Sequence, residues 1–324
     1  MQLPYTTLDI FTNTRYTGNP LAIVRVPSNL RPHLTEAQKL AIAAEINLSE
    51  TVFLHDVKDG EDWADYDIFT PRARMSFAGH PTIGTALYLS TLHKSNDHAF
   101  TGIRKIKTVA GLVPFDFWPP STSTSLGTAS VAIPHDVHIH AHRLPHPNPT
   151  SGLKAAAGEE ADRTVPLVSI VKGMAFNLVP FHDLDALGAV TSGLLPVDEV
   201  FRGAYLDRGS GWDVGYMGTF YYVDLGWEDI DGDRRVVRTR SIGTREDPGT
   251  GSASCALCCY LALVQGKEGE EKVEFHLTQG VEMGRRCDIF VSVVRTEDGK
   301  GIQEVRLRGE AVKVMEGVLS VGED

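Results

Sequence analysis

The sequence predicts an α+β fold built from two similar lobes, each of which is a sheet closed around one central helix. Three observations support this prediction. Short segments rich in β-branched and aromatic residues dominate the chain, two helical segments lack a polar face, and these two segments align with each other. A helix that is apolar on every side must be buried, and the strand-rich surroundings imply that sheet covers it.

The length of 324 residues is enough for two lobes of about 150 residues each. We expect an N-terminal lobe over 1–133 and a C-terminal lobe over 163–324, whose final strand could return to the N-terminal lobe. Residues 134–162 between the lobes are rich in Pro, His, Ala and Gly, which is typical of a loose linker.

The segments with strand-like composition are short and numerous. In the first half they lie at 5–11, 21–26, 51–54, 64–69, 103–109, 112–117 and 129–133. In the second half they lie at 167–171, 174–179, 199–204, 219–225, 235–242, 272–277, 287–294 and 304–307.

Three segments are predicted to be helices. The first covers 36–46, where Thr35 and Gln38 have the spacing of a capping box. The second begins at Gly79 in GHPTIGTALYLSTLH, and Pro81 suits its first turn. The third covers about 252–264, in GSASCALCCYLALV.

The second and third helices form an internal repeat. Their sequences align at an offset of 172 residues, with Gly79 matching Gly251 and Tyr88 matching Tyr260. We therefore expect the two lobes to share one plan, with a ligand cleft where the two helix N-termini face each other.

The charge and the cysteines exclude several classes of function. A net charge of −11 without a basic stripe argues against nucleic acid and anionic membranes as partners. The N-terminal residues do not read as a signal peptide, and we expect a soluble, cytoplasmic protein. Three of the four cysteines fall on one helix, so buried small hydrophobes are a better interpretation than a disulfide, metal or redox site: Cys255, Cys258, Cys259 and Cys287.

One histidine cluster leaves two interpretations open. His138, His140 and His142 alternate along HIHAHRLPH, so on a strand they could share a face and bind a metal. Because the surrounding sequence is linker-like, a solvated segment is favoured, and we predict no metal.

The start of the third helix, in EDPGTGSAS, is the first candidate for a binding site. Its small residues leave backbone N–H groups accessible, and the helix dipole favours an anion there. No lysine follows as in a phosphate loop, and the dinucleotide pattern is absent. A carboxylate-bearing small molecule is the better guest, near Gly251 and Ser252, although a simple helix cap is the alternative.

Polar side chains near the helix starts could carry the chemistry. Asp247 precedes the third helix, and His80 beside Gly79 holds the equivalent place at the second. Glu45 lies near the C-terminal end of the first helix, between Ala44 and Ile46. Apolar neighbours and the negative end of a helix dipole would both favour its protonated form, as a general acid/base requires. The alternative is an exposed glutamate at a fraying helix end.

The motifs then identify a family. The sequence resembles the phenazine biosynthesis-like (PhzF-like) isomerases, which have the diaminopimelate epimerase-type fold. The resemblance rests on these stretches: LDIFTNTRYTGNPLAIV (8–24), LAIAAEINLSETVF (40–53), YDIFTPRARMSFAGHPTIGTALYL (66–89), TRSIGTREDPGTGSASCALCCYL (239–261) and QGVEMGRRCDIFVSV (279–293). It implies two pseudo-symmetric β-barrel-like lobes, each enclosing a central α-helix.

The resemblance also implies roles for single residues. Glu45 is matched to the family's acid/base residue, which moves a proton without a cofactor, and Asp247 and His80 would orient the substrate. The substrate-binding positions of the cleft would be Asn19, Gly79, Gly251 and Ser252. The implied protein is a homodimer that acts on a small carboxylate-bearing metabolite.

The chain departs from the family's pattern at a few positions. Arg74, which is aligned with Glu246 in the repeat, stands where the family often has Glu, a local charge reversal that could change the substrate. Arg286 and Cys287 replace a more usual Pro-Ser.

Two other functions remain as alternatives. The first is a non-catalytic small-molecule-binding protein that retains the fold. The second is a racemase of the same superfamily that uses two opposed cysteines. The helix starts carry Ala78 and His80, and Pro248 and Thr250, in place of thiols, which argues against the racemase.

Overall fold

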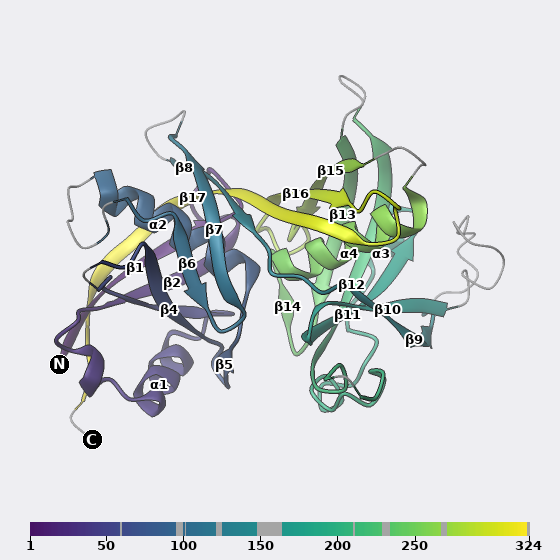
Figure 1. Ribbon diagram of the computed structural model, residues 1–324. Coiled ribbons are helices and arrows are strands. Elements are labelled where there is room, and N and C mark those ends of the chain that lie inside the picture. Colours follow the sequence, from purple (N-terminus) through teal and green to yellow (C-terminus); the bar gives the residue numbers. More distant parts are fainter. Residues whose placement is uncertain are drawn as a thin grey trace. The chain divides into compact units, whose positions relative to one another are not determined.

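The computed structural model describes residues 1–58, 60–94, 100, 102–120, 125–147, 164–209, 211–228, 234–266 and 271–322. The chain forms two compact units (Figure 1). Unit 1 contains Met1–Ala132 and Arg308–Asp324, and unit 2 contains Ile133–Leu307.

Unit 1 is a succession of paired strands with two α-helices. Its elements are β1 (Gln2–Ile10), β2 (Asn19–Val26), the 3₁₀ helix η1 (Arg31–His33), α1 (Glu36–Ile46), β3 (Thr51–His55), β4 (Trp63–Phe69), β5 (Arg74–Met75), α2 (Gly79–Lys94), β6 (Lys105–Thr108), β7 (Gly111–Trp118) and β8 (Ser125–Ala132). Strand β17 (Ile302–Ser320) begins in unit 2 and ends in unit 1, where it runs antiparallel to β1.

Unit 2 is built in the same way. Its elements are β9 (His138–Pro145), β10 (Thr164–Val171), β11 (Gly173–Phe181), α3 (Leu184–Gly188), β12 (Gly215–Trp227), β13 (Arg234–Ile242), β14 (Glu246–Asp247), α4 (Gly251–Gln265), β15 (Lys272–Gln279) and β16 (Cys287–Arg295).

The strand pairings of unit 1 recur in unit 2. In unit 1, β2 runs parallel to β3 and β4 runs parallel to β6, whereas β1–β2, β3–β4, β4–β5 and β6–β7 are antiparallel. In unit 2, β11 runs parallel to β12 and β13 runs parallel to β15, whereas β10–β11, β12–β13, β13–β14 and β15–β16 are antiparallel. In each unit one α-helix follows the two-residue strand, so the pairings repeat along with the helical motif.

The repeated helices α2 and α4 are buried because they have no polar face to give to water. In α4, residues 251–259 with Leu261 and Ala262 are buried, and the helix packs on β10, β11, β15 and β16. In α2, Ile83, Ala86 and Leu87 have no exposed surface, and the helix packs on β1, β2, β3, β7 and β8.

The three predicted helices are present at the expected positions. The capping box of α1 is formed: the Thr35 hydroxyl accepts from the Gln38 amide at 3.2 Å, and the Thr35 amide donates to Gln38 Oε1 at 3.0 Å. The helix ends at Asn47, whose φ of 55° is left-handed.

Three expectations about strands need correction. The expected strand at 199–204 is a turn, because the amides of Glu199 and Arg202 bond to carbonyls three residues back and Gly203 has a φ of 64°. The first part of the expected loose linker is strand β9, which pairs with β10, and residues 148–162 lie outside the described residues. The last strand covers Ile302–Ser320, well beyond the expected 304–307.

Among the described residues, no helix combines the length and the apolar character that crossing a bilayer requires.

The burial of α4 predicts the effect of a cavity at its centre. Leu257 has no exposed surface, so Leu257→Ala should lower the free energy of unfolding by about 2–5 kcal/mol. Val264 on the same helix is 39% exposed, so Val264→Ala should cost less than about 1 kcal/mol. Urea denaturation followed by circular dichroism measures both values, and equal losses would contradict the buried position of this helix.

Candidate active site

The polar residues at the start of α2 form a connected group in unit 1. His80 lies in the first turn of α2, Asn19 is the first residue of β2, and Ser49 and Glu50 directly precede β3. The two strand starts lie close together because β2 and β3 run parallel with Ala22 opposite Thr51. Since α2 packs on both strands, its first turn is held against them.

Hydrogen bonds determine which nitrogen of His80 carries the proton. The Ser49 hydroxyl donates to Asn19 Oδ1 at 3.4 Å, so the amide nitrogen of Asn19 faces the imidazole and donates to Nδ1 of His80 at 3.2 Å. Nδ1 is therefore an acceptor, and the proton is on Nε2. Nε2 lies 3.6 Å from Oε2 of Glu50.

Burial keeps this imidazole neutral. His80 is 3% exposed, and desolvation lowers its pKa from the ordinary value of 6.5 to about 3. Asn19 is fully buried, and the side chain of Glu50 is 17% exposed. A neutral imidazole faces the carboxyl group without placing a full positive charge beside it, and their separation of 3.6 Å is longer than a hydrogen bond.

Glu45, the sequence-based candidate for the acid/base, has different surroundings. It is exposed in the last turn of α1, and its neighbours Ala41 and Ala44 are exposed as well, so the expected apolar environment is wrong. The helix buries Lys39 and Ala43, and Glu45 lies about 200° around the helix from Ala43. The structure does not test the catalytic role predicted for Glu45, and its exposed position leads us to consider other carboxyl groups.

Sequence reasoning missed Glu50, although it belongs to the same NLSET motif. The signal was its place directly before TVFLH, an apolar strand whose residues are all buried in the structure. A carboxyl group at the start of a buried strand is partly shielded from water. A carboxyl group on an amphipathic helix is shielded only if it lies on the buried face of that helix.

The start of α4 in unit 2 is organised by a buried glutamine. Gln279 has no exposed surface; its Nε2 donates to the Asp247 carbonyl at 2.8 Å, and its Oε1 accepts from the Thr250 amide at 3.0 Å. The next residue, Gly280, has a φ of 74°, and a Cβ there would lie 2.6 Å from the Pro248 carbonyl oxygen. Gln279 and Gly280 together hold the turn that carries Asp247.

The side chain at the N-cap of α4 is directed toward Asp247. The Thr250 hydroxyl donates to Oδ2 of Asp247 at 2.5 Å and makes no cap hydrogen bond to the helix. The backbone N–H groups of the first turn, at Gly251 and Ser252, therefore have no side-chain cap from Thr250. This arrangement is suited to an anionic group of a ligand.

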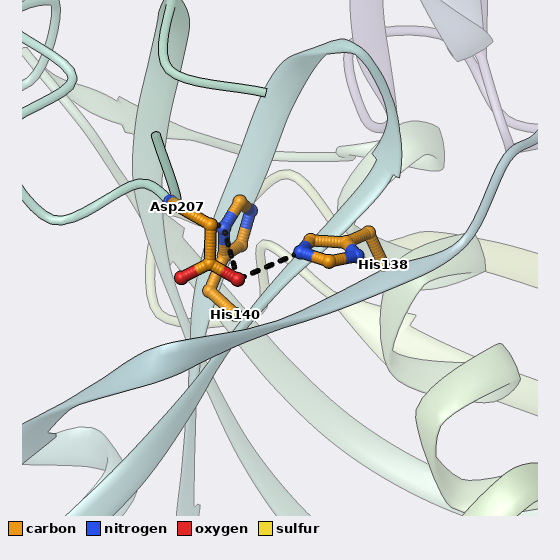
Figure 2. A group of neighbouring side chains, drawn as sticks. All are labelled: His138, His140 and Asp207. Atoms are coloured by element: carbon orange, nitrogen blue, oxygen red, sulfur yellow. Dashed lines mark hydrogen bonds and ion pairs between the residues drawn. The ribbon is translucent and has the colours of Figure 1, made fainter. Parts of the chain in front are cut away.

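The histidines of β9 come together only in part. His138 and His140 converge on the carboxylate of Asp207 (Figure 2). His142 is exposed and lies beside Tyr205. His138 Nε2 lies 2.8 Å from Asp207 Oδ2. The expectation of a solvated segment is wrong for His140, which is 2% exposed.

This cluster could hold a cation only by breaking a hydrogen bond. The candidate ligand atoms of His138, His140 and Asp207 lie within 4.8 Å of one another. However, Nδ1 of His140 accepts from the Asp207 amide at 3.0 Å, and its Nε2 donates to Ser169 at 2.8 Å. Both nitrogens are thus in use, and the cluster anchors the turn at Asp207 to β9.

The cysteines do not occupy the helix starts. Cys255 is in the second turn of α4, and all four cysteines are buried free thiols. Desolvation raises the pKa of Cys255, Cys258 and Cys259, which suppresses the thiolate form that a thiol-based racemase needs.

Solved structures show the class of fold. A PhzF-family phenazine biosynthesis protein of Bacillus anthracis is 21% identical and superposes with a TM-score of 0.72, over 99% of this chain and 100% of that chain. A hydroxyproline epimerase of Agrobacterium vitis is 13% identical with a TM-score of 0.60, over 98% and 92% of the two chains. The fold is thus that of the PhzF and proline-racemase-like proteins, with a barrel-like sheet and few helices.

The sequence identifies the family within that class. Residues 8–211 and 218–317 match the family of phenazine biosynthesis-like proteins, and the chain belongs to this family. An uncharacterized isomerase of Mesorhizobium japonicum is 28% identical over 98% of both chains. The trans-2,3-dihydro-3-hydroxyanthranilate isomerase of Pseudomonas fluorescens is 28% identical over 88% of both chains. The chain is accordingly an isomerase, and the resemblance drawn from the motifs is confirmed.

The depressed pKa of His80 predicts acid sensitivity. Between about pH 6.5 and pH 3, His80 is protonated in the unfolded chain but not in the folded chain. The free energy of unfolding therefore decreases as the pH falls through this range. The contribution of His80 to the slope is up to about 1.4 kcal/mol per pH unit. Urea denaturation of wild type and His80→Gln at pH 7, 6 and 5 should show a shallower pH dependence in the variant. Equal slopes would contradict the burial of a neutral imidazole.

The buried cysteines predict slow thiol modification. Native protein should react with a thiol reagent at least about 100-fold more slowly than protein in urea, because the sulfurs are buried and protonated. Mass spectrometry counts the labelled cysteines over time. Rapid native labelling of Cys255 with loss of activity would support the two-cysteine alternative.

Proposed function

We propose that this isomerase moves a proton on a small carboxylate-bearing substrate by general acid/base catalysis, without a cofactor. The observation that supports the proposal is the connected group of Ser49, Asn19, His80 and Glu50 in unit 1. It places the protonated nitrogen of one neutral imidazole 3.6 Å from one partly buried carboxyl group. General acid/base catalysis needs such an oriented group, and its contribution is typically 10²- to 10⁴-fold in rate.

Glu50 is the group that we assign to the proton transfer. As a carboxylate it would take a proton from a substrate carbon, and as a carboxylic acid it would return that proton to a different carbon. Nε2 of His80 lies 3.6 Å from Oε2 of Glu50, and a small approach of the two groups on substrate binding would let the Nε2 proton hold the orientation of the carboxyl group. Because the proton that is removed from one carbon is returned to another, the isomerisation needs no other reactant, oxidant or reductant.

The second half of the proposed site is the start of α4. The first-turn amides at Gly251 and Ser252 would hold the substrate carboxylate or the negative charge of an enolate-like intermediate. Asp247, held by Thr250, would orient a polar group of the substrate. This proposal requires the residues of both repeats to act on one substrate, and the cleft between two pseudo-symmetric lobes with central helices stays a prediction.

The substrate of a relative supplies the first compound to test. The Pseudomonas fluorescens relative is named for trans-2,3-dihydro-3-hydroxyanthranilate, a small carboxylate-bearing compound. We propose a substrate of this class, and we propose that the protein works as a cytoplasmic homodimer. Light scattering after gel filtration measures the mass of the particle in solution.

Two matched variants test the assignment of the proton. In D₂O, wild-type protein should introduce deuterium at a carbon of trans-2,3-dihydro-3-hydroxyanthranilate or of another small unsaturated acid. Glu50→Gln should slow this incorporation by at least about 100-fold. Glu45→Gln should change it less than about twofold, because Glu45 is exposed on α1. Nuclear magnetic resonance locates the deuterium, and circular dichroism verifies that both variants are folded.

Each other outcome has a definite meaning. A loss confined to Glu45→Gln would return the role to Glu45 and overturn the assignment to Glu50. Tight binding of the acids without deuterium incorporation by the wild type would favour a non-catalytic binding protein.

A further inference from the structure

An ion pair occupies the same place in both repeats. In unit 1, the short strand β5 lies against β4 with Arg74 opposite Phe69, and the Arg74 guanidinium contacts the Asp67 carboxylate. In unit 2, β14 lies against β13 with Glu246 opposite Ile242, and Glu246 contacts Arg240. Asp67 lies two residues before Phe69, and Arg240 lies two residues before Ile242. The two ion pairs therefore hold equivalent positions in the repeats.

The order of the charges is reversed between the repeats. Unit 1 has the acid on the long strand and the base on the short one, whereas unit 2 has the base on the long strand and the acid on the short one. Arg74 is therefore not an isolated charge reversal, because its partner Asp67 compensates it. The contact with Asp67 gives Arg74 a structural role that does not involve the substrate.

The ion pair in unit 2 is firmly held. Both guanidinium contacts to Glu246 are well formed, at 2.8 Å from Nε and 2.9 Å from Nη2. The guanidinium also donates through Nη1 to the carbonyls of Leu187 and Gly188, at 2.9 and 3.0 Å, and Arg240 is 5% exposed. A bidentate arginine–carboxylate pair fixes orientation as well as distance.

The ion pair in unit 1 is held from the other side. Asp67 is 7% exposed and also contacts Lys39 Nζ at 2.5 Å and His55 Nε2 at 2.8 Å. Arg74, whose side chain is 45% exposed, adds a third partner. Each repeat thus has a fixed, buried charge on the long strand and a more exposed charge on the short strand.

The short strands connect these fixed charges to the helix starts. β14 has two residues, so its backbone contributes few hydrogen bonds to β13. Successive side chains on a strand point to opposite faces, so Glu246 on Arg240 directs Asp247 away from Arg240 and toward Thr250. In unit 1, Arg74 precedes the turn that leads into Gly79 and His80.

We propose that the Arg240–Glu246 pair is a positioning device for Asp247 and the first turn of α4, and that Asp67–Arg74 has this function for His80 and α2. Neither ion pair contacts the substrate in this proposal. The proposal rests on the proposed function, because Asp247 and His80 act on the substrate there.

The test removes the charge of Glu246 and compares the effect with that of removing the acid from a control ion pair, whose arginine also lies on β13. Arg235, also on β13, pairs with Asp224 of β12, away from β14. Glu246→Gln should speed amide hydrogen exchange of residues 243–250 at least about tenfold, and lower kcat for deuterium incorporation about tenfold or more with KM changed less than about threefold. Asp224→Asn should leave both quantities within about twofold of wild type.

Further variants separate charge from folding. Glu246→Asp keeps the charge and should recover part of the exchange protection and of kcat. Arg74→Gln should have a smaller effect than Glu246→Gln, because Asp67 retains Lys39 and His55. The effect of Arg74→Gln should appear as faster amide hydrogen exchange of residues 71–78.

The outcomes distinguish this inference from the proposed function. If Glu246→Gln matches Asp224→Asn in hydrogen exchange, or if exchange rises while kcat is unchanged, the inference is overturned. If wild-type protein shows no deuterium incorporation, the proposed function fails, and hydrogen exchange alone then decides whether the ion pair holds the turn.

Discussion

The burial of two helices that have no polar face is the constraint on which the rest of this structure depends. A helix such as α4, with Cys255, Leu257 and Cys259 all out of contact with water, is stable only where strands cover it on several sides. The same requirement at α2 produces the same strand pairings in unit 1. Because the side chains along the middle of each helix are buried against strands, the polar side chains that could contact a ligand lie at the helix ends. The polar residues accordingly gather at Gly79–His80 and at Thr250–Gly251.

The polar side chains at the starts of α2 and α4 are oriented in different ways. At α2, burial and one amide hydrogen bond fix the tautomer of His80, so that the protonated Nε2 of a neutral ring faces Glu50 at 3.6 Å. At α4, the fully buried Gln279 binds two backbone groups of the turn, and the hydroxyl of Thr250 is committed to Asp247. In both places a side chain that carries no charge orients one that can. Such support limits the freedom of the carboxyl groups without neutralising them.

The sequence was informative where a local rule determines the structure. The capping box at Thr35, the apolar helices and their alignment follow from spacing and composition, and they predicted the helices and the repeat. The environment of Glu45 could not be predicted in this way, because the exposed face of α1 depends on which neighbours it packs against. The NLSET motif predicted the segment that contains Glu50, but only the 3.6 Å separation from His80 leads us to favour Glu50 over Glu45. Strand β9 was missed because its Pro- and His-rich composition is typical of loops.

Strand β17 has a consequence for how the chain is made. Its final residues pair with β1, Ser320 opposite Gln2, although more than three hundred residues separate them in the sequence. During synthesis on the ribosome, β1 therefore emerges long before this partner, and one of its edges stays open until β17 has been made. Open edges recruit other strands, so nascent chains are exposed to intermolecular association at that edge. Unit 2 can complete most of its strands earlier, and we expect the N-terminal region to be the last to reach its mature form.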